Sequence, residues 1–240
     1  MGYSIHDFQL ADHRLDEHII AAGGKFLVLT AGSPDRATLF DPDDSFAALT
    51  QPVDLTRGHA RFATLDTVNS VDIALQAPGG QFQFLAGVKP QAFSRLRLDT
   101  GQRHQVMKIP FSFEDQLDDN TETPSGFTVP LGALMLPTPA LDVKAIDASE
   151  TIDVGTQGTS NDPNGFLAAL SVANLGLVRG TLDDGAATIG VLLSEDESAG
   201  DLVPEGDDTA QADEDAISWT LSAGADTAKG YILLPYLLMG

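Results

Sequence analysis

Residues 71–84, VDIALQAPGGQFQF, contain the clearest fold signal of the chain. Apolar residues at positions 71, 73 and 75, and again at 82 and 84, alternate with polar or small residues. A period of two is typical of a β-strand with one buried face. Between the two runs, Ala77–Gly80 supplies the proline and glycines that favour a tight turn. The stretch therefore predicts an antiparallel hairpin.

Short runs of the same kind extend outward from this hairpin in both directions, at a spacing of roughly ten residues for most of the first half of the chain. They are Phe26–Thr30, Arg61–Thr64, Arg95–Leu98, Met107–Phe111, Leu141–Ala145, Ile152–Val154, Ile189–Leu193, Ile217–Leu221 and Tyr231–Leu238. Many short strands separated by turn residues predict an all-β protein built from antiparallel sandwich or barrel-like units. Trp219 alternates with its neighbours so that it faces the core.

The distribution of linker signals predicts two domains. Residues 1–24 have no clear period and end in two glycines, so we expect an extended N-terminal arm or a disordered leader. Residues 25–115 form the first β-sandwich domain, the acidic segment 116–125 is a linker, and residues 126–240 form the second domain. At most one short helix is expected, over residues 166–178, because Asp162 and Pro163 suit a helix start.

Charge is divided sharply along the chain. The net charge is −22, yet residues 57–108 hold seven of the thirteen basic residues and only three acids. From residue 142 onward there are eighteen acids against three basic residues. Alternating arginines on a strand are either an ordinary solvent face or a docking face for an acidic protein surface, where arginine binds carboxylates in bidentate fashion. The candidate contact residues are Arg57, Arg61, Arg95, Arg97 and Arg103.

The sequence offers little catalytic chemistry. There is no cysteine, so disulfides and thiolate metal sites are excluded. Phosphate-binding glycine loops and nucleophile elbows are missing. Only His59 and His104 lie outside the arm, and we expect both to be polar residues beside the basic band rather than catalytic bases. Acids are too abundant for pairing to indicate a glycosidase. We expect no enzymatic activity and no cofactor.

Two binding questions concern the acidic part of the chain. Residues 195–215 lack the ligand order of an EF-hand, and the alternatives are a solvated loop or a calcium-binding loop. Duplex nucleic acid is disfavoured as a partner, because it requires a broad basic surface. The longest apolar stretch, Tyr231–Met239, is about half the length of a membrane-spanning helix, so we expect no membrane segment.

Several strings resemble head-associated structural proteins of tailed bacteriophages. In the second half they are AIDASETIDVG from Ala145, DPNGFLAALSV from Asp162 and SWTLSAGADTAKGYILLPYL from Ser218, and in the first half RHQ from Arg103 and IPFS from Ile109. The resemblance covers roughly residues 35–240 and includes no catalytic signature.

The resemblance implies a virion protein that decorates and cements the capsid, with β-sandwich domains and no enzymatic role. It implies the major capsid protein as partner and location on the capsid surface. We also expect a symmetric homo-oligomer, with a trimer as the first expectation. The alternative function is a receptor- or carbohydrate-binding module of the phage tail; a hydrolase of host surface glycan is disfavoured.

Overall fold

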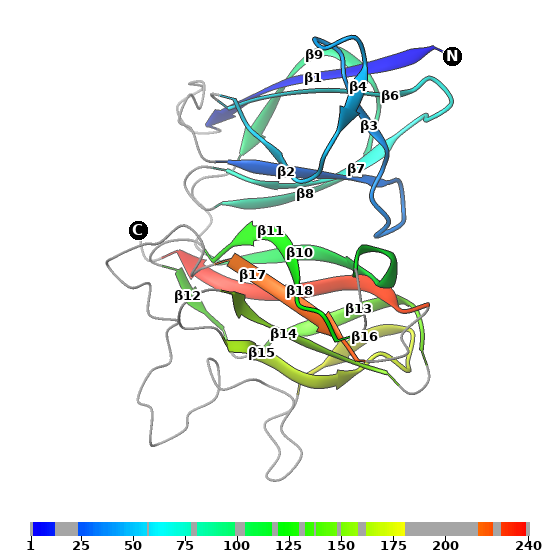
Figure 1. Ribbon diagram of the computed structural model, residues 1–240. Helices are drawn as coiled ribbons and strands as arrows, with labels where there is room; N and C mark the ends of the chain where they lie inside the picture. Colours follow the sequence, from blue (N-terminus) through cyan, green and yellow to red (C-terminus); the bar gives the residue numbers. More distant parts are fainter. Residues whose placement is uncertain are drawn as a thin grey trace. The chain divides into compact units, whose positions relative to one another are not determined.

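The computed structural model describes residues 2–12, 24–56, 58–77, 81–98, 104–116, 120–129, 133–136, 138–147, 150–157, 162–180, 216–222 and 227–238. Regular structure in these residues is almost entirely β-strand, and their one helical element is a single 3-10 turn, η1 (Phe113–Asp115) (Figure 1). The predicted all-β fold class is therefore confirmed. The chain divides into two compact units, Met1–Gln102 and Arg103–Gly240.

Unit 1 holds two sheets. Its strands are β1 (Tyr3–Asp12), β2 (Lys25–Thr30), β3 (Leu39–Asp41), β4 (Ala47–Leu49), β5 (Val53–Asp54), β6 (His59–Leu65), β7 (Val71–Gln76), β8 (Phe82–Val88) and β9 (Gln91–Leu98). Sheet A has the order β4-β3-β6-β1-β9, and sheet B has the order β5-β2-β7-β8. All these pairs are antiparallel except β1–β9, which is parallel.

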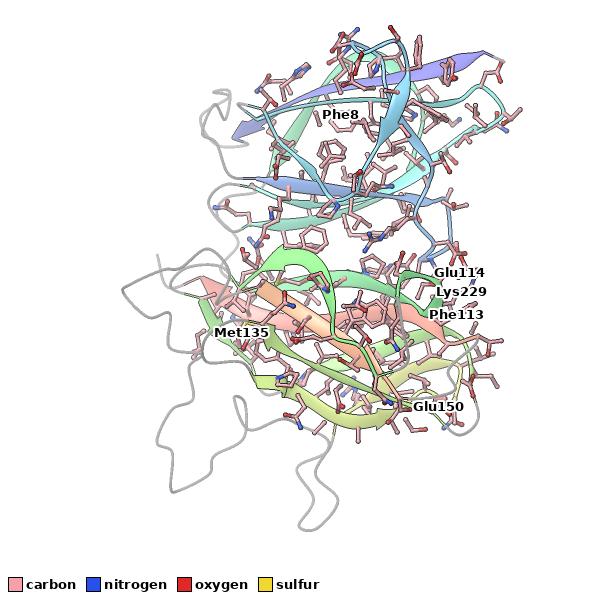
Figure 2. The ribbon with its side chains drawn as sticks, in the orientation of Figure 1. Phe8, Phe113, Glu114, Met135, Glu150 and Lys229 are labelled. Carbon is pink, nitrogen blue, oxygen red and sulfur yellow. The ribbon has the colours of Figure 1, made fainter. Side chains whose placement is uncertain are left out.

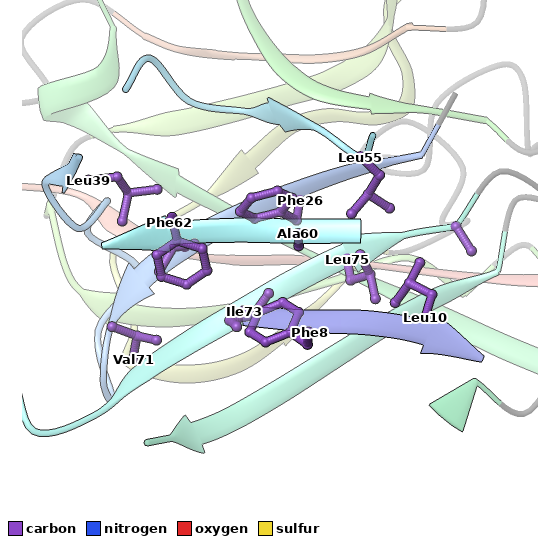
Figure 3. Packing of buried hydrophobic residues seen from close by; sticks show 12 residues of the cluster. Phe8, Leu10, Phe26, Leu39, Leu55, Ala60, Phe62, Val71, Ile73 and Leu75 are labelled. Atoms are coloured by element: carbon purple, nitrogen blue, oxygen red, sulfur yellow. The ribbon is translucent and has the colours of Figure 1, made fainter. Parts of the chain in front are cut away.

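The core of unit 1 lies between these two sheets (Figure 3). It includes Phe8 and Phe62 from sheet A and Phe26, Ile73 and Leu75 from sheet B, all of them buried. The rings of Phe8 and Phe26 both contact that of Phe62, at centroid distances of 5.9 and 5.6 Å. The hairpin predicted from residues 71–84 is confirmed as β7 and β8, which pair from Val71–Val88 to Gln76–Phe82.

The prediction of an N-terminal arm is wrong for the part of residues 1–24 that the structure describes. β1 is an inner strand of sheet A, paired with β6 on one side and β9 on the other. Phe8 and Leu10 belong to the core, and Figure 2 shows Phe8 pointing between the strands of unit 1. Two of the inward positions are polar, Ser4 and His6, and this concealed the strand period.

Unit 2 also holds two sheets. Its strands are β10 (His104–Ser112), β11 (Thr123–Thr128), β12 (Ala133–Met135), β13 (Ala140–Ala145), β14 (Thr151–Gln157), β15 (Asp162–Ser171), β16 (Gly176–Arg179), β17 (Ala216–Leu221) and β18 (Lys229–Leu238). Sheet C has the order β10-β18-β13-β16, with β12 also on β18, and sheet D has the order β11-β17-β14-β15. All of these pairs are antiparallel.

The two sheets of unit 2 are joined by aromatic packing in a sandwich-like arrangement. Phe111 of β10 and Trp219 of β17 are both buried, and their rings meet edge-on at 6.2 Å. Trp219 therefore faces the core, as the alternation around it predicts. Met107 and Ile109 of β10 are also fully buried.

The predicted linker over residues 116–125 is wrong, because this segment is part of unit 2. The side-chain amide of Gln116 donates to Leu221 O at 3.1 Å and its Oε1 accepts from Leu221 N at 2.8 Å. Thr123 then starts β11, which pairs with β17. The boundary between the units lies instead at Gln102–Arg103. β10, which was predicted to belong to the first domain, is therefore a strand of sheet C in unit 2.

The predicted helix over residues 166–178 is also wrong, because the described structure there is β15 followed by β16. The register between β14 and β15 shifts twice, so the strand is irregular. Ala169 has a positive φ of 49°, and its N–H bonds Asp153 Oδ1 at 2.6 Å. This irregularity buries Phe166, Leu167 and Leu170 together, a spacing that imitates a helix in the sequence.

Candidate docking surface

The face of sheet A that points away from the core of unit 1 carries polar and charged side chains. On β1 and β6, core residues alternate with residues of this outer face. The register pairs Asp7 with Arg61 and Gln9 with His59 across the two strands. Directly opposed residues share a face of the sheet, so these four side chains form two neighbouring rows on the outer face.

β9 brings two further basic positions to the same sheet. Its backbone pairs Arg95 with Gln9 and Arg97 with Ala11, in parallel orientation. His59, Gln9 and Arg95 therefore occupy one row across β6, β1 and β9. His59 and Arg95, which are 36 residues apart in the sequence, are therefore two strands apart in the sheet, a backbone separation of about 10 Å.

Carboxylates compensate part of this positive charge. His59 Nε2 lies 2.7 Å from Asp7 Oδ1, and Arg61 Nε lies 3.5 Å from Asp7 Oδ2. The Arg61 guanidinium also binds Asp43 Oδ1. Asp7 and Asp43 lie outside the basic window of the sequence, and nothing local indicates them, since Asp7 and His59 are 52 residues apart along the chain.

His6 lies beside this network but on the core side of β1. It is fully buried, stacks on the ring of Phe62 at 4.6 Å, and places Nε2 3.3 Å from Thr64 Oγ1. Its Nδ1 has no hydrogen-bond partner among the described residues. Burial lowers the pKa of His6 from 6.5 to about 4, because the charged imidazolium loses its hydration there.

The five predicted contact residues divide into two groups. Arg61, Arg95 and Arg97 share sheet A, while Arg57 and Arg103 lie outside the described residues. Whether any of the five contacts a partner stays a prediction. Lys108, which belongs to the same basic window of the sequence, lies in unit 2 with its ammonium 4.0 Å from the ring centroid of Tyr231. The basic window of the sequence is therefore divided between the two units.

The described residues contain no group of three or more His, Cys, Asp or Glu side chains that could hold a metal ion. The acidic segment 195–215 falls outside the described residues. His104 starts β10 of unit 2 and is exposed. Among the helices of the described part of the chain, none is long and apolar enough to span a membrane.

No protein-family model matches the chain, and no curated protein matches it in sequence. Among solved structures, it aligns with BcpA, the major pilin subunit of Bacillus cereus, at 8% identity and a TM-score of 0.21, and with a variant of BcpA at 9% and 0.22. Each alignment covers 99% of this chain and 59% of the pilin chain. At these TM-scores the similarity to the pilin carries no argument about fold or function.

Proposed function

We propose that this chain is a non-enzymatic virion protein that decorates and stabilises the capsid of a tailed bacteriophage, with the major capsid protein as its partner. The sequence resemblance to phage head proteins supports the class. One structural observation supports a docking face: the register of sheet A places Arg61 on β6 and Arg95 and Arg97 on β9, the two strands that flank β1, in a chain whose net charge is −22.

The contribution of each arginine to docking follows from its neighbours. Arg61 is already paired with Asp7 and Asp43, so its net charge toward a partner is small. Its role is to hold the β3–β4 loop, which contains Asp43, against β6. The proposed contact with an acidic partner is therefore assigned to β9, at positions 95 and 97. Such a contact guides association electrostatically and weakens as salt rises.

A binding assay on capsids that lack this protein tests the proposal. Purified protein is expected to sediment with such capsids and to raise the temperature and the osmotic shock that they survive, because ligands that bind only the assembled state stabilise it. Capsids of equal robustness with and without the protein would contradict a cementing role. A copy number of a few per virion, rather than hundreds, would favour the tail module instead.

Matched charge reversals test the docking face. Arg95→Glu and Lys89→Glu change the net charge equally and both lie in unit 1, but Lys89 is an exposed residue between β8 and β9. Arg95→Glu is expected to weaken capsid binding more than Lys89→Glu, with a shallower dependence of the dissociation constant on salt. Equal weakening by both variants would mean that only the total charge matters and that the outer face of sheet A is not the contact.

A further inference from the structure

Sheet C of unit 2 ends in an unusually apolar edge. Its last strand, β16, pairs with β13 on one side, and no strand in the described part of the chain pairs with its other side. Leu175 and Leu177 are 66% and 56% exposed, and Ile146, just after β13, is 43% exposed. Soluble proteins usually protect such edges with charged side chains or bulges, so exposed leucines here call for an explanation.

The backbone of β16 directs its free hydrogen-bonding groups outward. Gly180 N–H donates to Pro139 O at 3.3 Å, which identifies that pair as hydrogen-bonded. Hydrogen-bonded and non-hydrogen-bonded pairs alternate along an antiparallel ladder. The pairs Arg179–Ala140 and Leu177–Asp142 are therefore of the second kind, and the N–H and C=O groups of Leu177 and Arg179 point to the open edge.

We propose that this edge pairs with the β16 strand of a second copy of the chain, antiparallel and across a two-fold axis at Leu177. In this register Leu177 faces Leu177 of the other copy as a hydrogen-bonded pair, which matches the outward direction of its N–H and C=O. Leu175 faces Arg179, whose aliphatic stem can cover the leucine. The edge is thus complementary to itself, as a two-fold contact requires.

The local charges leave room for a second copy at this position. Two chains of net charge −22 repel each other over most of their surfaces. Asp142 lies opposite Leu177 in the strand register. Its carboxylate oxygen Oδ1 forms an ion pair with Lys144 Nζ at 2.9 Å. Arg179 adds an exposed positive charge. The strand and its neighbour therefore present apolar surface with no uncompensated acid among these residues.

The pairing goes beyond the proposed capsid role, because it requires no capsid and is testable on the isolated protein. A two-fold contact also differs from the trimer expected from the sequence. The molar mass of the full chain, measured by light scattering and analytical ultracentrifugation over a range of concentrations, is expected to show a monomer–dimer equilibrium. A monomer at every concentration, or a trimer, would overturn the proposal.

A matched pair of variants locates the contact. Leu177→Lys places two ammonium groups opposite each other across the two-fold axis and is expected to raise the dimer dissociation constant about tenfold or more. Val106→Lys is the control: Val106 is 51% exposed on β10, at the other edge of sheet C, and the charge change is equal. An unchanged dimer in Leu177→Lys would overturn the proposal.

Hydrogen exchange on the wild-type protein gives a test that does not depend on any variant folding. The amides of Leu177 and Arg179 are expected to become protected as protein concentration rises, because they bond to the second copy. The amide of Val178 faces β13 and should be protected at all concentrations. Concentration-independent exchange at Leu177 in a sample shown to be dimeric would place the contact elsewhere and contradict the proposal.

Discussion

At the residue scale, the most consequential side chain is one that carries no charge in the folded state. His6 is enclosed between β1 and the ring of Phe62, and the folded structure holds it neutral to about pH 4. The unfolded chain binds a proton at this residue near pH 6.5. Between these two values the unfolded state binds more protons than the native state, so the free energy of unfolding falls as the pH falls.

The stability of unit 1 is therefore expected to decrease between pH 6.5 and pH 4, and to be independent of His6 above that window. The full effect of a shift from 6.5 to about 4 is about 3 kcal/mol. Urea unfolding followed by circular dichroism at pH 7, 5.5 and 4.5 measures it. His6→Phe retains a ring against Phe62 but cannot titrate, so its stability should fall less over the same range. Identical slopes for both proteins would contradict this role of His6.

Trp219 makes a second prediction at this scale. Its side chain is 1% exposed and contacts Phe111, and its indole N–H has no hydrogen-bond partner among the described residues. Trp219→Ala is expected to lower the free energy of unfolding of unit 2 by about 3–5 kcal/mol. Trp219→Phe should cost clearly less, because it keeps the aromatic contact and removes an unpaired donor. Calorimetric unfolding of the three proteins compares them, and equal losses for both variants would contradict this account.

At the scale of elements, β1 contributes both to the core of unit 1 and to the outer face of sheet A. An inner strand contributes two rows of hydrogen bonds, and β1 also supplies Phe8 and Leu10 to the core. The same strand positions Asp7 next to His59 and Arg61, so it orders the outer face as well as the core.

Removal of residues 1–12 is accordingly expected to abolish the cooperative unfolding of unit 1, whereas a dispensable arm would leave it unchanged. The single variant Phe8→Ala should destabilise the unit by about 3–5 kcal/mol. Gln9→Ala, on the outer face of the same strand, is the control and should cost much less. Thermal unfolding measures the stability of the truncated protein and of the two variants. Wild-type stability of the truncated protein would show that residues 1–12 are a dispensable arm.

At the scale of the whole molecule, the position of the unit boundary decides which fragments can fold. β10 lies in sequence next to the strands of unit 1, but it pairs with β18 along nine residues of sheet C. A cut at Gln102–Arg103 separates the two units, whereas a cut at residue 115 removes an edge strand from sheet C.

Fragments 1–102 and 103–240 are therefore each expected to unfold cooperatively when expressed separately. Fragment 116–240 lacks Met107, Ile109 and Phe111, all fully buried in the native protein, and should be unfolded or strongly destabilised. Chemical-shift dispersion in NMR spectra distinguishes these cases directly. A well-folded 116–240 fragment would show that β10 is not an integral part of unit 2.

The sequence by itself determined the features that depend on local periodicity. The hairpin at residues 71–84, the all-β class and the inward direction of Trp219 follow from the alternation of apolar and polar residues, because successive side chains of a strand point to opposite faces. The concentration of arginine in residues 57–108 was also visible without a structure. Its meaning for docking stays a prediction.

Tertiary structure decided everything that depends on the pairing partner. The sequence did not indicate β1, because two of its inward positions, Ser4 and His6, are polar. These positions face inward only because β1 pairs with β6 and β9. β15 was predicted to be a helix because Asp162 and Pro163 suit a helix start, and its irregular pairing with β14 removes the period of two that would have indicated a strand. Asp7 compensates Arg61 only because two strands far apart in the sequence lie side by side. Strand pairing is a long-range interaction, so the register that sets these neighbours is not encoded in any short segment.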